Sequence, residues 1–179
     1  MLREPVSGPA GNGPPGASSR GMTMQLWSEA FEPGGAIPAR FTADGDNVSP
    51  PLRWSNVPTR ARELALLLED LDAAEARPFV HWIVWRIPPR LDGLPEALGV
   101  PQDGEPWGEA LEGANSLEHV GYDGPEPPDD TPHRYRFRLL ALDEPLRLET
   151  MPDSDAIERA VHGHVVEEAR LEGRYGRRD

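Results

Sequence analysis

Two histidines and two aspartates are the residues of this chain whose types and spacing could do chemistry. His81 and His133 each lie at or near the start of an apolar segment, and Asp70 and Asp72 follow closely on a third apolar run. An imidazole ring can donate hydrogen bonds to an anion, and a carboxylate within about 4–6 Å favours its protonated form. Two carboxylates and an imidazole at one site are costly to desolvate unless they pair or meet a ligand. These residues therefore predict a small polar binding site.

Three segments are expected to be the strands that position these side chains. Glu63–Glu69 is a short apolar run typical of a fully buried strand, and Phe79–Ile87 is rich in aromatic and β-branched residues. An antiparallel pairing of these two strands through residues 71–78 would bring Asp70 and Asp72 close to His81. The third segment is His133–Leu142.

The third segment alternates strictly at its start, which predicts the face on which each side chain lies. Arginines occupy positions 134, 136 and 138, and three arginines are expected to face solvent. His133 and Tyr135 must then point inward. The same parity in the second strand puts His81 on one face with Phe79, Ile83 and Trp85.

The remaining signals are weaker and indicate a mainly β fold with one or two helices near the C-terminus. Gln25–Ser28 and Leu52–Trp54 are further strand candidates. A helix is predicted from Ser154 to Ala169, because apolar residues recur there every four positions and Asp153 or Ser154 can cap its start.

The segment 121–128 (GYDGPEPP) is too rich in proline for regular structure. A rigid loop with exposed N–H groups can form the wall of an anion site, although a plain surface turn is the common alternative. Each histidine and each aspartate has the same alternative by itself, as a hydrogen-bonded structural residue or a solvated turn residue.

Composition restricts the function classes. The 179 residues suit one domain, with residues 1–21 as a disordered Gly/Pro/Ser tail and 22–179 as the folded domain. The net charge of −13 opposes non-specific contact with nucleic acid and with anionic membranes. Cysteine is absent, which excludes disulfides and thiolate chemistry. Without an apolar leader or a long apolar run, the chain is expected to be a soluble, cytoplasmic protein that does not insert into membranes.

Three rival functions fit the sequence less well. A nucleophilic hydrolase lacks a suitable serine, since the motif G-x-S-x-G is absent and Ser49 lies in the segment VSPP. A metal site at His162 and His164 is disfavoured, because positions i and i+2 of a helix point about 200° apart. His164 and Glu168 could share an ion, but such helical pairs are mostly solvated. A protease or kinase inhibitor acting through its surface is the third rival, and the sequence marks no inhibitory loop.

Four blocks of the sequence resemble motifs of the phosphatidylethanolamine-binding protein family, in the same order. Residues 44–54 (DGDNVSPPLRW) resemble D-G-x-N-x-S-P-P-L-x-W, and residues 69–73 (EDLDA) resemble the D-P-D-A-P motif. Residues 79–82 (FVHW) resemble the H-W strand, and 121–128 followed by 133–135 resemble G-Y-x-G-P-x-P-P and H-R-Y. The C-terminal segment 163–175 is also similar. The resemblance is strongest to the bacterial, Raf-kinase-inhibitor-like branch.

The resemblance implies a two-sheet β fold with a small pocket that accepts phosphate or a phosphorylated head group, without catalysis and without a cofactor or metal. It is also compatible with a homodimer, and it leaves open whether the ligand is a lipid or a soluble metabolite. Carried over by motif, the expected ligand-binding residues are Asp70, Asp72, Phe79, His81, Tyr122, Gly124, Pro128, His133 and Tyr135.

Two departures from the family pattern bear on anion binding. Leu71 and Ala74 replace the prolines of the D-P-D-A-P motif, so the loop loses rigidity. Glu126 stands where many bacterial members carry cysteine, and a further carboxylate near the pocket is expected to disfavour anions. The acidic residues leave a second interpretation open, in which the pocket receives a cationic group such as an ammonium. The kinase-inhibitor role belongs to eukaryotic relatives and is not transferred.

Overall fold

The structure, a computed structural model, describes residues 22–74, 77–99 and 107–177. The tail predicted for residues 1–21 lies outside this range. Two short strands precede the long ones, and the only α-helix of the described residues comes late in the chain. The elements are β1 (Gln25–Trp27), a 3-10 turn η1 (Ala39–Phe41), β2 (Leu52–Ser55), β3 (Glu63–Asp70), β4 (Phe79–Ile87), β5 (Gly93–Leu94), β6 (Leu111–Glu112), β7 (His133–Leu142), α1 (Ser154–Val161) and β8 (Val165–Tyr175).

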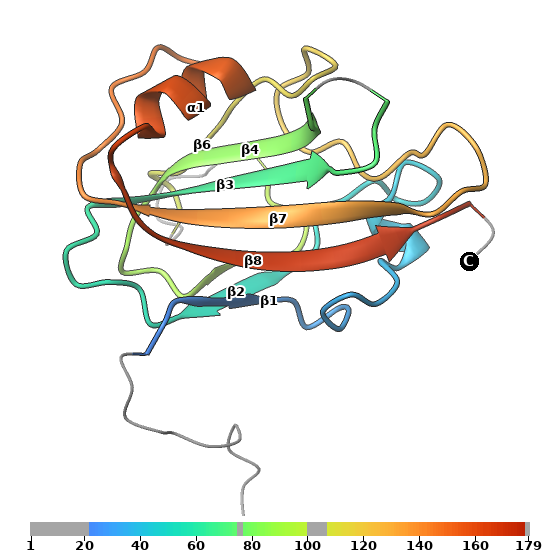
Figure 1. Cartoon of the computed structure of the whole chain (residues 1–179), viewed down its shortest axis with the longest axis horizontal. Coiled ribbons are helices and arrows are strands. Elements are labelled where there is room, and N and C mark those ends of the chain that lie inside the picture. Colours follow the sequence, from blue (N-terminus) through green and yellow to red (C-terminus); the bar gives the residue numbers. More distant parts are fainter. Residues whose placement is uncertain (1–21, 75–76, 100–106, 178–179) are drawn as a thin grey trace, which may run out of the picture.

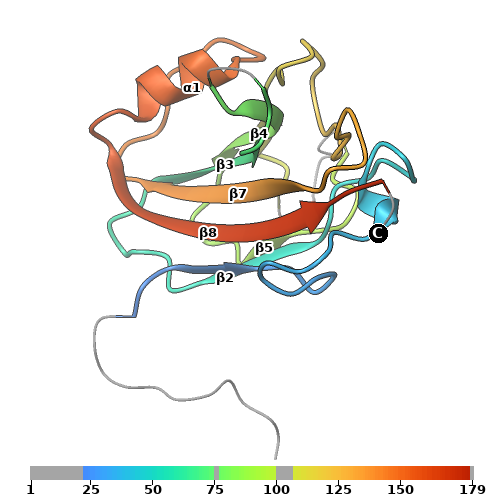
Figure 2. The same ribbon diagram turned by 45° about the vertical axis from the view of Figure 1, so that its right-hand side comes forward.

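The strands form two sheets, and every pair of named strands is antiparallel. The small sheet has the order β1-β2-β5 and the large sheet the order β6-β4-β3-β7-β8. Figures 1 and 2 show α1 on one side of the large sheet and the small sheet on the other. The mainly β, two-sheet fold predicted from the sequence is confirmed.

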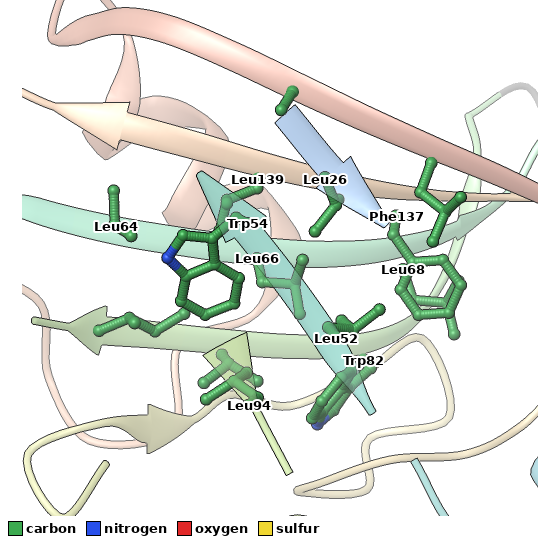
Figure 3. Close-up of a cluster of buried hydrophobic side chains, with 14 of the residues drawn as sticks. Leu26, Leu52, Trp54, Leu64, Leu66, Leu68, Trp82, Leu94, Phe137 and Leu139 are labelled. Atoms are coloured by element: carbon green, nitrogen blue, oxygen red, sulfur yellow. The ribbon is translucent and has the colours of Figure 1, made fainter. Parts of the chain in front are cut away.

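The main core lies between the two sheets, and a second apolar cluster lies beneath the helix. Leu64, Leu66 and Leu68 of β3 point toward the small sheet, where they join Leu52 and other side chains of β2 (Figure 3). The intervening residues of β3 belong to the layer that α1 covers. Because burying one leucine stabilises the fold by about 2 kcal/mol, this two-sided burial explains why the β3 sequence is almost continuously apolar.

The three principal strands were predicted correctly. β4 and β7 have the predicted bounds, and β3 extends one residue further, so that Asp70 is the last residue of the strand. The weaker candidates also form strands, as β1 and β2. β3 and β4 are antiparallel neighbours, as expected.

The predicted helix over Ser154–Ala169 is too long. Asp153 caps its start by accepting a hydrogen bond from the backbone of Ala156 at 2.7 Å, but α1 ends at Val161. Gly163 then adopts a left-handed conformation (φ +84°), which ends the helix and lets β8 begin at Val165. Apolar residues at every fourth position suggested a longer helix, but the end of that segment belongs to β8, which pairs with β7 from His133 to Leu142. No helix in the described residues is both long and apolar enough to cross a bilayer.

The prediction that all three arginines of β7 face open solvent is wrong for two of them. Arg136 and Arg138 form ion pairs with Glu69 of β3, both at 2.8 Å, and their side chains are 21% and 15% exposed. Arg138 also contacts Glu158 of α1 at 2.7 Å. The parity was assigned correctly, but the helix and a buried carboxylate cover this face.

Candidate functional site

The end of the large sheet where β3 stops holds a pocket of about 420 Å³. Strand register places Asp70 opposite Phe79 on one side and Tyr135 on the other. The loops that follow β3 and precede β7 complete the walls. The lining residues are Ala43, Asp70, Ala73, Ala74, Phe79, His81, Leu117, Asp123, Gly124, Glu126, Pro128 and His133.

His133 and Asp70 form a buried pair at the pocket. Nδ1 of His133 lies 2.7 Å from Oδ2 of Asp70, and the two side chains are 10% and 7% exposed. The second oxygen of Asp70 accepts the backbone N–H of Asp72 at 2.8 Å. Since the carboxylate accepts, Nδ1 carries a proton, and Nε2 of His133 is the ring nitrogen left for a ligand.

His81 is held by the opposite wall. Its Nδ1 lies 2.9 Å from the backbone oxygen of Asp123. A carbonyl oxygen can only accept, so Nδ1 of His81 must donate and Nε2 is left free for a ligand. Burial lowers the pKa of His81, while the hydrogen bond to Asp123 and the charge of Asp70 oppose that shift. The ring is therefore predominantly neutral at pH 7.

The parity predicted for His81 is wrong in part. Ile83 and Trp85 lie in the layer beneath α1, on the opposite side of the sheet from His133. The register of β3 against β4 shifts between Leu68 and Glu69, which marks a β-bulge next to His81. A bulge re-aims the residues beside it, so His81 turns to the ring of Tyr135, with centroids 5.4 Å apart. Regular alternation alone would have put this ring beneath α1 with Ile83 and Trp85, away from the pocket.

Tyr135 lies beneath the two histidines and is fully buried. Its ring centroid is 5.4 Å from that of His81 and 6.4 Å from that of His133. Its hydroxyl makes no hydrogen bond of standard geometry within the described residues. Burial and the neighbouring charge of Asp70 raise the pKa of Tyr135 well above its usual range. The phenol is thus a neutral donor beside both imidazoles.

The loop 121–128 forms one wall of the pocket, as the sequence indicated. Gly124 donates its N–H to Oδ1 of Asn47 at 2.7 Å, and Ala43 donates to the oxygen of Pro125 at 3.1 Å. A Cβ on Gly124 would come within 2.5 Å of the backbone oxygen of Phe41. Only glycine lets the two loops approach so closely, which explains its place in the wall.

Glu126 lies in the pocket wall, where its carboxylate is expected to disfavour an anion, but it has a cationic neighbour. Arg177, which follows β8, places Nη2 3.4 Å from Oε1 of Glu126 and Nε 3.5 Å from Asp44. The guanidinium offsets part of the negative charge at the pocket mouth.

Six of the nine predicted residues line the pocket, and Tyr135 lies beneath it. Asp72 instead forms a bidentate pair with Arg134, at 2.7 and 3.0 Å, and Tyr122 donates its hydroxyl to the backbone oxygen of Phe41 while its ring packs against Trp82. Neither of these two lines the pocket. Hydrogen bonds from Arg134 lower the pKa of Asp72 to about 2. That any of the nine binds a ligand stays a prediction.

Sequence reasoning missed several lining residues. Leu117 lies in a segment for which the sequence offered no functional signal, and Asp123 stood in the quoted motif without a role. The backbone of Asp123 contacts His81, and its carboxylate makes tertiary contacts with Asn115 and His119. Burial acts to raise the pKa of Asp123, but hydrogen bonds from Asn115 and His119 lower it overall. No group of His, Cys, Asp and Glu within the described residues is arranged to hold a metal ion.

Comparisons with known proteins agree with the motifs. The family model described as phosphatidylethanolamine-binding protein matches residues 27–176. A UPF0098 protein of Methanothermobacter thermautotrophicus is 44% identical over 154 residues, covering 86% of this chain and 99% of that relative. Another from Pyrococcus abyssi is 35% identical, with 88% of each chain covered.

Two solved structures share the fold. The Chlamydia trachomatis protein CT736, titled a putative phosphatidylethanolamine-binding protein homologue, is 35% identical with a TM-score of 0.78, covering 87% of this chain and 98% of that one. E. coli YbcL, titled a member of the mammalian PEBP family, is 25% identical with a TM-score of 0.79, covering 87% and 99%. With a family model matching most of its length, this chain belongs to the phosphatidylethanolamine-binding protein family.

Proposed function

We propose that this protein binds a small anion, phosphate or a phosphorylated head group, in the pocket at the end of β3. The observation that carries the proposal is the convergence of two imidazoles from separate strands. Nδ1 of His133 is held by Asp70 and Nδ1 of His81 by the backbone of Asp123. Each ring is thereby fixed with Nε2 as its unused nitrogen, and Nε2 of a protonated ring donates to an oxyanion.

The neutral state of His81 specifies how the anion would bind. An unprotonated Nε2 accepts a hydrogen bond, so a ligand at neutral pH must offer a donor there or bring a proton to the ring. A monoprotonated phosphate oxygen can donate to His81, and the buried hydroxyl of Tyr135 is a further donor near both rings. Binding of a fully ionised anion should instead couple to protonation of His81 and strengthen as the pH falls.

Most of the remaining lining is apolar, with Phe79, Leu117 and Pro128 among the side chains that shape the pocket. Such walls exclude water and strengthen the few polar contacts. They also accommodate a short organic substituent on the anion, which fits a phosphate ester as well as inorganic phosphate.

We also propose that binding is not followed by chemistry. Among the described lining residues there is no serine, threonine, cysteine or lysine. The candidate nucleophiles that remain are the carboxylates and the two imidazoles, and Asp70 already accepts hydrogen bonds from His133 and from the backbone of Asp72. The described lining therefore lacks an activated hydroxyl, thiol or amine nucleophile.

Isothermal titration calorimetry tests the proposal with inorganic phosphate, sulfate and phosphoethanolamine, against acetate and ethanolamine. The critical variants are His133→Asn and His81→Asn. The asparagine amide keeps a donor near the position of Nδ1 but removes Nε2, so the contacts to Asp70 and Asp123 are preserved. We expect each variant to weaken phosphate binding about tenfold.

The matched control is His164→Asn, because His164 contacts Asp143 at 3.1 Å outside the pocket lining. Phosphate affinity should be unchanged in this variant. Heat with ethanolamine alone would favour the cationic-group interpretation, and no heat with any anion would refute the proposal. Turnover of a phosphoester that disappears in His133→Asn would refute the non-catalytic part.

A further inference from the structure

A buried polar cluster behind the pocket wall joins β4 to the loop that precedes residues 121–128. Asn115 is its centre and is only 5% exposed. Its Nδ2 donates to Oδ2 of Asp123 at 2.7 Å, and its Oδ1 accepts the backbone N–H groups of Leu117 at 2.9 Å and His119 at 3.1 Å. Both ends of the amide are therefore used, which fixes its orientation.

Asp123 is the link from this cluster to the pocket. Its backbone oxygen accepts Nδ1–H of His81 at 2.9 Å, and its backbone N–H donates to the oxygen of His81 at 3.1 Å. Its carboxylate, meanwhile, is held by Asn115 and by Nδ1 of His119 at 2.9 Å. The peptide group that orients the His81 ring is thus anchored through its own side chain.

The same loop is attached to β4 a second time, next to the first contact. Ser116 donates its N–H to the oxygen of Val80 at 2.8 Å, and its hydroxyl oxygen accepts the N–H of Val80 at 2.9 Å. Neither bond involves Asp123 or the His81 ring. Ser116 therefore holds the loop on the strand, whereas Asn115 holds the group that the ring contacts.

We infer that Asn115 is a positioning residue for His81: acting through Asp123, it keeps the imidazole as the Nδ1–H tautomer with Nε2 available to the anion. This inference rests on the proposed function for its consequence in binding, but the tautomer itself is a property of the free protein. Without the Asn115 bond, the Asp123 peptide group loses one of its side-chain anchors. The ring can then take up the Nε2–H tautomer, in which Nε2 is a donor instead of an acceptor.

Every charged or titratable group around the ring bears on its tautomer. Asp70 and His133 face it from β3 and β7, and Tyr135 lies beneath it. Glu126 lies across the pocket, while His119 is 66% exposed on the far side of Asp123. All variants should therefore be measured at the same pH, so that a change of tautomer is not confused with a change of protonation.

Long-range ¹H–¹⁵N correlation spectra of the histidine rings, recorded on ligand-free protein, distinguish the two tautomers directly. For the wild type we expect the His81 signals of a single Nδ1–H tautomer. For Asn115→Ala we expect a substantial Nε2–H population. The matched control is Ser116→Ala, which removes a loop–strand contact of similar length and should leave the His81 signals unchanged.

His119→Ala is the second test and guards against misfolding of Asn115→Ala. It removes another anchor of Asp123 from an exposed position, and we expect a smaller change of the His81 tautomer in the same direction. A wild-type His81 spectrum in Asn115→Ala, or an equal change in Ser116→Ala, would overturn the inference. If Asn115→Ala does not fold, an unchanged His81 spectrum in His119→Ala overturns it. A tautomer change without phosphate binding by the wild type would instead refute the proposed function and leave the positioning role standing.

Discussion

Two neighbouring carboxylates of β3 show how one strand serves structure on one face and a binding site on the other. Glu69 and Asp70 are both buried, at 4% and 5% exposure, and side chains of successive strand residues point to opposite faces. Glu69 lies on the α1 side with Arg136 and Arg138 at 2.8 Å. Asp70 lies on the pocket side with the imidazole of His133 at 2.7 Å.

The difference lies in the partners and in the space around them. Arginine stays protonated at all pH values at which the fold exists, so Glu69 is permanently neutralised and needs no ligand. Asp70 is paired with an imidazole, and the pair opens into a cavity. A buried carboxylate enclosed by arginines indicates a structural role, whereas one that shares a pocket with histidines indicates a ligand site.

The largest expected effect concerns stability on the closed face. Glu69→Gln leaves two half-buried guanidinium groups without their shared carboxylate, which should lower the free energy of unfolding by about 3 kcal/mol. Urea denaturation measures this loss. Phosphate binding measured by calorimetry should be unchanged. A loss below about 0.5 kcal/mol would mean that the Glu69 cluster is no more than a surface network.

On the open face the same chemical change should act on binding instead. Asp70→Asn removes the negative charge and leaves one acceptor oxygen for two donors, Nδ1–H of His133 and the N–H of Asp72, so the His133 ring is held less firmly. We expect phosphate affinity to fall about tenfold, while the free energy of unfolding changes by about 1 kcal/mol or less. Calorimetry and urea denaturation of the same preparation separate the two quantities. The comparison fails if Asp70→Asn unfolds as readily as Glu69→Gln and binds phosphate normally.

A smaller effect is expected in the pH dependence of stability. Burial lowers the pKa of His81 below 6.5, so between that lowered value and 6.5 the unfolded chain binds more protons than the native one. This contribution to stability is complete above pH 6.5 and is lost as the pH falls through that window. His81→Asn removes it, so the variant should lose less stability than the wild type between pH 7 and pH 5. Urea denaturation at pH 5, 6 and 7 measures both slopes, and parallel slopes would show that the buried ring is not desolvated.

The smallest effect is expected for Asp72, which pairs with Arg134 outside the pocket. The Asp72 side chain is 31% and that of Arg134 51% exposed, so solvent screens the pair and Asp72→Asn should cost about 1 kcal/mol at most. Because the pKa of Asp72 is lowered to about 2, the contribution is present above pH 4 and lost as the pH falls toward 2. Phosphate affinity should stay at the wild-type value in calorimetry. A tenfold drop in phosphate affinity would show that Asp72 contributes to the binding site, as the family motif had implied.

The sequence predicted the parts of the fold that depend on local patterns. The bounds of β4 and β7 follow from runs of aromatic and β-branched residues, and the alternation in β7 placed His133 and Tyr135 on the correct face. The short strands β5 and β6 have only two residues each, so no periodicity could reveal them. The strand β8 was not predicted, because Val161 and Val165 have helical spacing on either side of Gly163.

The pocket depends more on tertiary contacts, and the sequence predicted it less completely. His81 reached the correct face because of a bulge that alternation cannot show. Asp72 matched a family motif but turns to Arg134, since a neighbouring guanidinium offers it a bidentate partner. Asn115 and Leu117 contribute through contacts with residues of β4 and the loop 121–128, which no local pattern brings together.

The central claim is that an anion sits between the two histidines, and selenate provides the most direct measurement. Selenate has the shape and charge of sulfate, and its selenium scatters anomalously, so a crystal soaked with it at acidic pH, where His81 can be protonated and donate, reveals bound selenate. We expect an anomalous peak in the pocket within hydrogen-bond distance of Nε2 of both His81 and His133, and no such peak in His133→Asn. Peaks only beside exposed arginines such as Arg40 or Arg134, with none in the pocket at saturating selenate, would contradict it.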